Sequence, residues 1–298
     1  MNLSFEGIHA ALVTPFDAHE RVDGDALGAL VEDLLHRGIR GVAVNGSTGE
    51  FPALTPQERK QCVETVCAAA TGRGTVTVGV GAMRTSEAVE HASHAAAHGA
   101  ACLLVVSPYY EPLSEDEIVA YFRAIAQVHL PIMIYNNPAA TGWSMRPELV
   151  ARLAEIEAVR YLKDTTGDAR RLFRIQQLCG DGLELLNGQD TLALLGFLAG
   201  ARATVWGAPN ATPEHCVRLW ELTAGTPDLE RARRLWDAFY PVNHFFEEEG
   251  YVAAVKAGTT LRGVDVGAPR RPLLPLAPDR VDTLRRLLEH LDEVAASL

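Results

Sequence analysis

The sequence predicts an α/β protein that folds as a closed (β/α)8 TIM barrel and continues into a C-terminal helical extension. Short apolar or β-branched runs alternate with longer helical patterns eight times before residue 224. Such alternation is typical of a parallel sheet, and eight repeats in roughly 220 residues fit a closed barrel better than an open sheet. No GxGxxG pattern follows the first predicted strand, so a dinucleotide-binding sheet loses its usual support.

The predicted strands are continuous apolar runs, as expected for strands buried on both faces. They cover residues 8–14, 41–44, 76–80, 101–106, 131–135, 159–163, 183–186 and 203–206. Several of the helices between them open on Ser, Thr or Asp with Pro or an acidic residue in the first turn, which are residue types that suit a helix N-terminus. These helices cover residues 24–37, 56–70, 85–98, 114–128, 146–154, 168–178, 189–199 and 212–223.

The alternation stops after residue 224, and three helical patterns follow, near residues 228–246, 250–258 and 279–296. The Pro-rich stretch APRRPLLPLAP separates the last two. We therefore expect a barrel domain in residues 1–224 and a helical extension in residues 225–298.

The composition is that of an ordinary globular protein, with 48% hydrophobic and 22% charged residues in a chain of 298. A formal net charge of -11 argues against a broad nucleic-acid or anionic-membrane surface, because such surfaces need clustered Lys and Arg. Any anionic substrate must therefore be held locally.

The sequence predicts neither a membrane-spanning helix nor a signal peptide. The richest apolar stretch, residues 192–208, is interrupted by Arg202. The opening MNLSFEGIHAALVTPF has no basic segment and no long apolar block, so it does not resemble a signal peptide. The odd number of cysteines, five, and the lack of a CxxC pattern favour reduced thiols over disulfides or a zinc site. These observations predict a cytoplasmic protein.

In a barrel of this type the catalytic groups lie at the carboxyl ends of the strands. The predicted strands end on Thr14-Pro15, on residues 45–48, 79–81, 107–110 and 135–138, on Lys163, on residues 187–190 and on Gly207. Turn chemistry explains the glycines and prolines. It does not explain hydroxyl groups, a tyrosine and a lysine at one rim, and this convergence predicts an active site there.

Lys163 ends the predicted strand 159–163, within the run YLKDTTGD. Apolar neighbours disfavour a charged amine, and a neutral amine can attack a carbonyl carbon. The alternative is a solvated lysine at a strand end, which is the commoner case for a lysine taken alone. The other polar strand ends reverse that preference and point to a Schiff-base enzyme.

The segment Gly46-Ser47-Thr48-Gly49-Glu50 lies between the second predicted strand and a helix. Glycines around two hydroxyl residues let successive N–H groups point at one spot, which makes a small anion site suited to a carboxylate. The alternative is a simple turn into a helix. Glu50 has two possible roles, bracing this loop or touching the substrate.

Tyr135 ends the fifth predicted strand, next to the strand that carries Lys163, so the phenol and the amine are expected to lie close together. A tyrosine beside an amine can transfer protons. The alternative is an aromatic ring that fills the barrel mouth.

The third predicted helix carries a possible metal site. Glu87, His91, His94 and His98 share one face, while Val89, Ala96 and Ala100 suit packing on the barrel. We expect the histidine face to be exposed to solvent and to bind no metal, because histidine is common on half-exposed helices.

Taken together, the motifs resemble the pyruvate-dependent class I lyases that include N-acetylneuraminate lyase and dihydrodipicolinate synthase. The resemblance covers the whole chain and rests on the order and spacing of GSTGE at 46–50, SPYY at 107–110, YNNPAATG at 135–142, YLKDTTGD at 161–168 and NGQD at 187–190.

The resemblance implies an imine between Lys163 and the 2-oxo group of the substrate, with the segment Gly46, Ser47 and Thr48 holding the substrate carboxylate. Tyr135 matches the proton-transfer tyrosine of the family, and Ser47 links it to a second tyrosine. That second tyrosine matches Tyr110, which in the family reaches in from a neighbouring subunit. The resemblance further implies a homotetramer built as a dimer of dimers and chemistry that needs no cofactor and no metal.

Substrate selectivity is expected to lie in a pocket with amide, hydroxyl and carboxylate groups. The positions concerned are Asn137, Ala139, Ala140, Thr165, Gln189, Asp190, Thr191 and Gly207. Such a pocket suits hydroxylated sugar acids.

Two of these positions separate the branches of the family. Ala140 stands where the synthases have an arginine that holds the carboxylate of the second substrate. Thr191 stands where the neuraminate lyases have an acidic residue. The resemblance therefore favours cleavage or dehydration of a shorter hydroxylated 2-oxo acid, such as a 2-keto-3-deoxy sugar acid. The alternatives are 4-hydroxy-tetrahydrodipicolinate synthase, which joins pyruvate to aspartate semialdehyde, and an inactive ligand-binding member.

Overall fold

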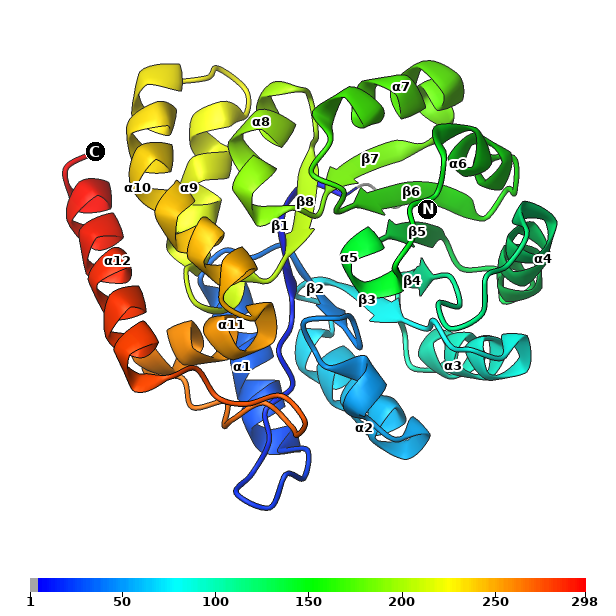
Figure 1. The fold of residues 1–298 in the computed structure, drawn as a ribbon, viewed down its shortest axis with the longest axis horizontal. Helices are drawn as coiled ribbons and strands as arrows, with labels where there is room; N and C mark the ends of the chain where they lie inside the picture. Colours follow the sequence, from blue (N-terminus) through cyan, green and yellow to red (C-terminus); the bar gives the residue numbers. More distant parts are fainter. Residues whose placement is uncertain (1–4) are drawn as a thin grey trace.

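The computed structural model describes residues 5–298 and forms a closed parallel barrel in which each strand pairs with the next and β8 pairs with β1. Figure 1 shows the strands at the centre of the molecule and the helices around them. The strands are β1 (Gly7–Ala11), β2 (Gly41–Val44), β3 (Thr75–Gly79), β4 (Cys102–Val106), β5 (Ile132–Asn136), β6 (Val159–Asp164), β7 (Glu184–Asn187) and β8 (Ala203–Trp206). The predicted TIM barrel is thereby confirmed. The prediction that the N-terminal segment is not a signal peptide falls partly on residues 1–4, which lie outside the described residues.

Helices follow the strands and cover the outside of the barrel. They are α1 (Gly24–His36), α2 (Pro56–Ala70), α3 (Thr85–Ala97), α4 (Glu115–Ala126), α5 (Pro138–Thr141), α6 (Pro147–Ala154), α7 (Ala169–Cys179), α8 (Ala193–Leu198) and α9 (Pro213–Thr223). Short 3-10 turns are η1 (Phe51–Ala53), η2 (Gly180–Gly182), η3 (Asp190–Leu192) and η4 (Ala208–Asn210). The C-terminal part consists of α10 (Leu229–Glu248), α11 (Tyr251–Leu261) and α12 (Pro278–Ala296).

Two helices begin with reciprocal caps. At α2, the Thr55 side chain accepts from the Glu58 N–H while the Glu58 carboxylate accepts from the Thr55 N–H. Ser114 and Glu117 form the same arrangement at α4. Each such cap typically contributes about 1 kcal/mol.

Two helical predictions need correction. The helix expected over 189–199 begins as the 3-10 turn η3, and α8 starts only at Ala193. The reason is that Asp190 and Thr191 are held by side chains from the C-terminal helices instead of by a helix of their own. The short helix α5 was not expected; Asn137 caps it by accepting from the Ala140 N–H, and Pro138 suits its first turn.

The core has two layers. Apolar side chains between the strands and the outer helices form the larger cluster. A smaller cluster fills the barrel and includes Phe5, whose ring meets Tyr161 edge-on at 4.7 Å between centroids. Phe5 precedes β1, so it lies at the amino end of the strands. The opposite, carboxyl end carries the polar strand ends.

The C-terminal helices pack on the barrel instead of extending away from it. α10 contacts α9, α12 and η3, and α11 contacts η4. The expected boundary at 224/225 falls between α9 and α10 and stays a prediction, because these contacts tie the two parts together. Within residues 5–298, no helix has both the length and the apolar character needed to cross a membrane.

Candidate active site

A cavity of about 260 Å³ opens at the carboxyl ends of the strands. Side chains from β5, β6 and β8, from the loops after β2, β5, β6 and β7, and from the C-terminal helices converge on it. Its lining residues are Ser47, Thr48, Tyr135, Asn137, Ala139, Lys163, Thr165, Gly188, Gln189, Asp190, Trp206, Glu247, Tyr251 and Val252.

Lys163 is the buried amine of this cavity, with 4% of the residue exposed. A Cβ atom at Gly188 would lie 2.7 Å from Cε and 2.8 Å from Cγ of Lys163. Only glycine therefore leaves room beside the lysine side chain. The NGQD motif at 187–190 therefore provides, through Gly188, the room that the Lys163 side chain occupies, in addition to its polar side chains.

Tyr135 lies next to this amine. Tyr135 of β5 is in register with Lys163 of β6, and the amine nitrogen sits 4.4 Å from the centroid of the tyrosine ring. The tyrosine hydroxyl accepts from Asn137 Nδ2 at 2.8 Å and donates to Ser47 Oγ at 3.5 Å. A polar chain therefore runs from the strand β5 to the 46–50 loop, which is the geometry that proton transfer needs.

The 46–50 loop offers donors to the cavity. Gly49 and Glu50 use their N–H groups in turns within the loop. The N–H groups of Ser47 and Thr48 donate to no group of the described chain. Two free N–H groups beside two hydroxyls suit a bound carboxylate. Asn45 and Glu50, which flank the loop, both have left-handed backbone conformations, with φ of 58° and 56°.

Glu50 anchors this loop through contacts with the C-terminal part of the chain. Its Oε1 lies 2.8 Å from Nζ of Lys256, and both side chains are almost fully buried. Its Oε2 accepts from the Arg270 N–H at 2.8 Å. Burial lowers the pKa of Lys256, and the nearby Glu50 carboxylate opposes that shift. Of the two roles that the sequence left open, these contacts favour bracing.

The side of the cavity facing the C-terminal helices is acidic. Asp190 Oδ2 accepts from the Tyr251 hydroxyl at 2.7 Å, and Oδ1 accepts from the Ala208 N–H at 3.1 Å. Burial, helped by the neighbouring Glu247 carboxylate, raises the pKa of Asp190 to about 7. Glu247 itself accepts from the N–H of Thr191 at 3.0 Å and from its hydroxyl at 2.7 Å.

Most predicted site residues meet at this cavity, but five do not line it: Gly46, Ala140, Thr191, Gly207 and Tyr110. Gly46 lies at the start of the 46–50 loop, and its carbonyl accepts hydrogen bonds from the N–H groups of Gly49 and Phe51. Gly207 makes room for Tyr251, whose hydroxyl would lie 2.5 Å from a Cβ atom there. Ala140 is exposed on α5. Tyr110 is 83% exposed and lies apart from the cavity of its own chain.

Four lining residues were missed by the sequence reasoning: Trp206, Glu247, Tyr251 and Val252. Trp206 ends β8, and its place at a strand end was the signal that could have found it. The other three lie in α10 and α11, where no motif distinguishes them from surface residues.

The expectation that the histidine face of α3 is solvent-exposed was wrong for His91. His91 is only 5% exposed, because the buried face of α3 is made by Ala88, Ala92 and Ala95 together with His91. Val89 and Ala96 are half-buried. His94 and His98 instead approach Glu64 of α2, and the potential ligand atoms of these three lie within 4.8 Å of one another.

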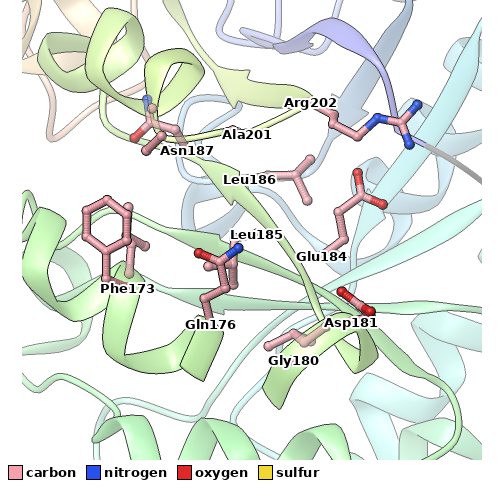
Figure 2. Close-up of a pocket in the computed structure, with 15 residues that line it drawn as sticks. Phe173, Gln176, Gly180, Asp181, Glu184, Leu185, Leu186, Asn187, Ala201 and Arg202 are labelled. Carbon is pink, nitrogen blue, oxygen red and sulfur yellow. The ribbon is translucent and has the colours of Figure 1, made fainter. Parts of the chain in front are cut away.

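A second cavity, of about 370 Å³, lies between α7, β7 and α8. Figure 2 shows Phe173 and Gln176 of α7 at one wall, and Glu184 and Arg202 at another. Residues 184–187, which make up β7, line this cavity, and Gly188 follows the end of the strand. Lys163 and Tyr135 do not line it.

Comparisons with known proteins agree with this geometry. The chain matches the dihydrodipicolinate synthetase family over residues 4–291. It is 33% identical over 292 residues to a 4-hydroxy-tetrahydrodipicolinate synthase of Exiguobacterium sp., covering 97% of this chain and 99% of that protein. It is 36% identical to an uncharacterized DapA-like lyase of Halobacterium salinarum, over 93% of this chain and 91% of that protein.

A solved structure adds a ligand to the comparison. YagE, a prophage protein of the dihydrodipicolinic acid synthase family from E. coli K12 solved in complex with pyruvate, has 28% identity and a TM-score of 0.91 over 97% of this chain and 99% of that one. The resemblance drawn from the motifs is confirmed. The chain therefore belongs to the dihydrodipicolinate synthetase family of pyruvate-dependent class I aldolases, and it is an enzyme of the Schiff-base lyase class.

Proposed function

We propose that this enzyme cleaves or dehydrates a small hydroxylated 2-oxo acid through an imine on Lys163. The observation that carries the proposal is the buried Lys163 amine 4.4 Å from the centroid of the Tyr135 ring, in the space that Gly188 leaves open. The free N–H groups of Ser47 and Thr48 support binding of the substrate carboxylate beside it.

The reaction follows from these positions. The Lys163 nitrogen attacks the 2-oxo carbon, and loss of water gives the imine. For cleavage, Tyr135 takes the proton of the C4 hydroxyl, the C3–C4 bond breaks, and its electron pair moves into the protonated imine. An aldehyde leaves, the enamine gains a proton at C3, and hydrolysis releases pyruvate. For dehydration, the C3 proton is removed and the C4 hydroxyl leaves as water.

Trapping tests the imine directly. Incubation with pyruvate and borohydride should add a single reduced pyruvate adduct to Lys163, seen by mass spectrometry. Lys163→Met should give none, and an unmodified Lys163 at saturating pyruvate would refute the mechanism as well as favour the inactive ligand-binding alternative.

Condensation of pyruvate with aspartate semialdehyde is the second candidate, because the synthase of Exiguobacterium sp. is similar over the whole chain. Ala140 offers no charge for the second carboxylate, and loss of one Arg–carboxylate contact costs about a hundredfold. We expect weak or no condensation by the unaltered protein. A gain of condensation in Ala140→Arg supports this reading, whereas efficient condensation without it overturns the assignment.

We also propose a homotetramer in the cytoplasm, with Tyr110 completing the site of a neighbouring subunit. The exposed position of Tyr110 and the five free thiols among residues 5–298 support this proposal. Tyr110→Phe and Lys163→Ala chains should each be nearly inactive and recover activity when mixed. Subunit exchange without recovery would contradict the shared site.

A further inference from the structure

We infer that Glu247 of α10 selects the far end of the substrate and restricts the enzyme to 2-oxo acids with one carboxylate and an uncharged, hydroxylated tail. This inference rests on the proposed function and goes beyond it by naming what the tail must carry. Its starting point is a contact between two distant parts of the chain, Thr191 after β7 and Glu247 near the end of α10.

The Glu247 carboxylate is held in a fixed orientation. Thr191 donates to it twice, from its N–H at 3.0 Å and from its hydroxyl at 2.7 Å. Glu247 is half-buried and lines the cavity beside Gln189 and Asp190. Position 191, which is not acidic in this chain, therefore positions an acidic group that α10 supplies.

The two ends of the cavity differ in charge. The carboxylate of a 2-oxo acid belongs at the loop of Ser47 and Thr48, where N–H groups are free. Among the described lining residues Lys163 is the one cation, and the imine uses it. Asp190 and Glu247 are the acidic groups. A second substrate carboxylate would meet the Glu247 carboxylate without a cation to pair with.

Hydroxyl groups on the substrate tail suit the end of the cavity that Glu247 lines. Each Glu247 oxygen accepts one hydrogen bond from Thr191, and a carboxylate oxygen can accept another. Hydrogen bonds from hydroxyls to an ionised carboxylate are among the stronger ones. Gln189, Thr165 and Asn137 add further polar groups to the lining.

The test compares two acids with the same six-carbon skeleton, 2-keto-3-deoxygluconate and 2-keto-3-deoxyglucarate, which differ by a carboxylate at C6. Each is titrated against pyruvate in the borohydride-trapping assay, so that binding is measured even without turnover. The wild-type protein should bind the monocarboxylate at least tenfold more tightly, which is the scale of like-charge repulsion near a protein surface. Glu247→Gln should reduce that ratio by about tenfold.

Glu248→Gln is the matched control, since Glu248 is the exposed neighbour of Glu247 on α10 and should leave the ratio unchanged. Equal binding of the two acids, no competition by either, or a ratio that Glu247→Gln does not alter would overturn the inference. Each of these results can occur while pyruvate is still trapped on Lys163. A wild-type protein that traps no pyruvate would instead refute the proposed function.

Discussion

The cavity at the strand ends and the cavity between α7, β7 and α8 differ in which side chains line them more than in size. The cavity between α7, β7 and α8 is the larger, about 370 Å³ against about 260 Å³ at the strand ends. The larger one is lined by apolar side chains together with Gln176, Asp181, Glu184, Asn187 and Arg202, and its described lining has no lysine and no tyrosine (Figure 2). The smaller one holds a buried amine beside a phenol, and two acids that Tyr251 and Thr191 hold by hydrogen bonds. A buried amine with a phenol beside it, not volume, marks the candidate site.

The segment that runs from β7 into the following loop contributes to both cavities and shows where the difference begins. Residues 184–187 face the larger cavity, and the residues from Gly188 onward line the smaller one. The change occurs where the strand ends and the chain turns across the barrel mouth. Backbone that is not committed to sheet pairing can present side chains to a ligand.

The largest difference between the cavities should appear on removal of the amine. Lys163→Met should reduce kcat/KM on the order of 10⁴-fold or more, because no imine can form. Gln176→Ala, in the larger cavity, should stay within twofold. Steady-state pyruvate release measures both. Equal losses in the two variants would mean that the larger cavity takes part in the reaction.

Removal of the phenol should have the next largest effect. Tyr135→Phe keeps the ring beside Lys163 but removes the hydroxyl bonded to Asn137 and Ser47. Loss of a proton-transfer group typically reduces kcat by about 10² to 10⁴-fold. Borohydride trapping of pyruvate should still occur, though more slowly. A variant with unchanged kcat would leave Tyr135 as a packing residue only.

The brace beneath the 46–50 loop should matter for stability and for substrate carboxylate binding. Lys256→Met leaves the buried Glu50 carboxylate without its ion pair, at a cost of about 3 to 5 kcal/mol in the free energy of unfolding. KM for the substrate should rise as the loop shifts. Lys60→Met removes the more exposed pair with Glu90 and should cost about 1 kcal/mol or less. Urea denaturation of the two variants distinguishes these cases.

Acid titration gives the smallest and most specific contrast. Burial raises the pKa of Asp190, in the smaller cavity, to about 7, and also raises that of Glu184, in the larger one. A carboxyl with a raised pKa in the folded state binds its proton more tightly there than when unfolded, so it lowers stability as pH rises from its ordinary value of 3.8 towards 7.

Asp190→Asn should therefore gain stability relative to the wild type between about pH 4 and pH 7 and no further above that range. The substitution should also change the pH profile of kcat/KM. Glu184→Gln should change the pH dependence of stability alone. A wild-type and an Asp190→Asn protein with parallel stability curves over this range would show that the Asp190 pKa is ordinary.

The barrel and the amine could be predicted because local patterns determine them. Apolar runs mark the strands, and a polar residue at the end of such a run, as at Lys163 and Tyr135, lies at the rim in any parallel barrel. The acidic wall could not be predicted, because its contacts join residues 56 and 61 positions apart, from Thr191 to Glu247 and from Asp190 to Tyr251. The prediction that His91 is exposed was wrong because the other buried residues of α3 are small alanines, and the His91 ring is buried beside them.

The space beside Lys163 has a consequence for recognising relatives that have lost activity. Gly188 carries no reactive group, yet any side chain there would occupy the volume of the Lys163 methylenes and of Thr165. A homologous chain that keeps the lysine but replaces this glycine should be a pseudoenzyme, with its nucleophile present and unable to reach a substrate. The residue that reports loss of function in a sequence can thus be one that never touches the reaction.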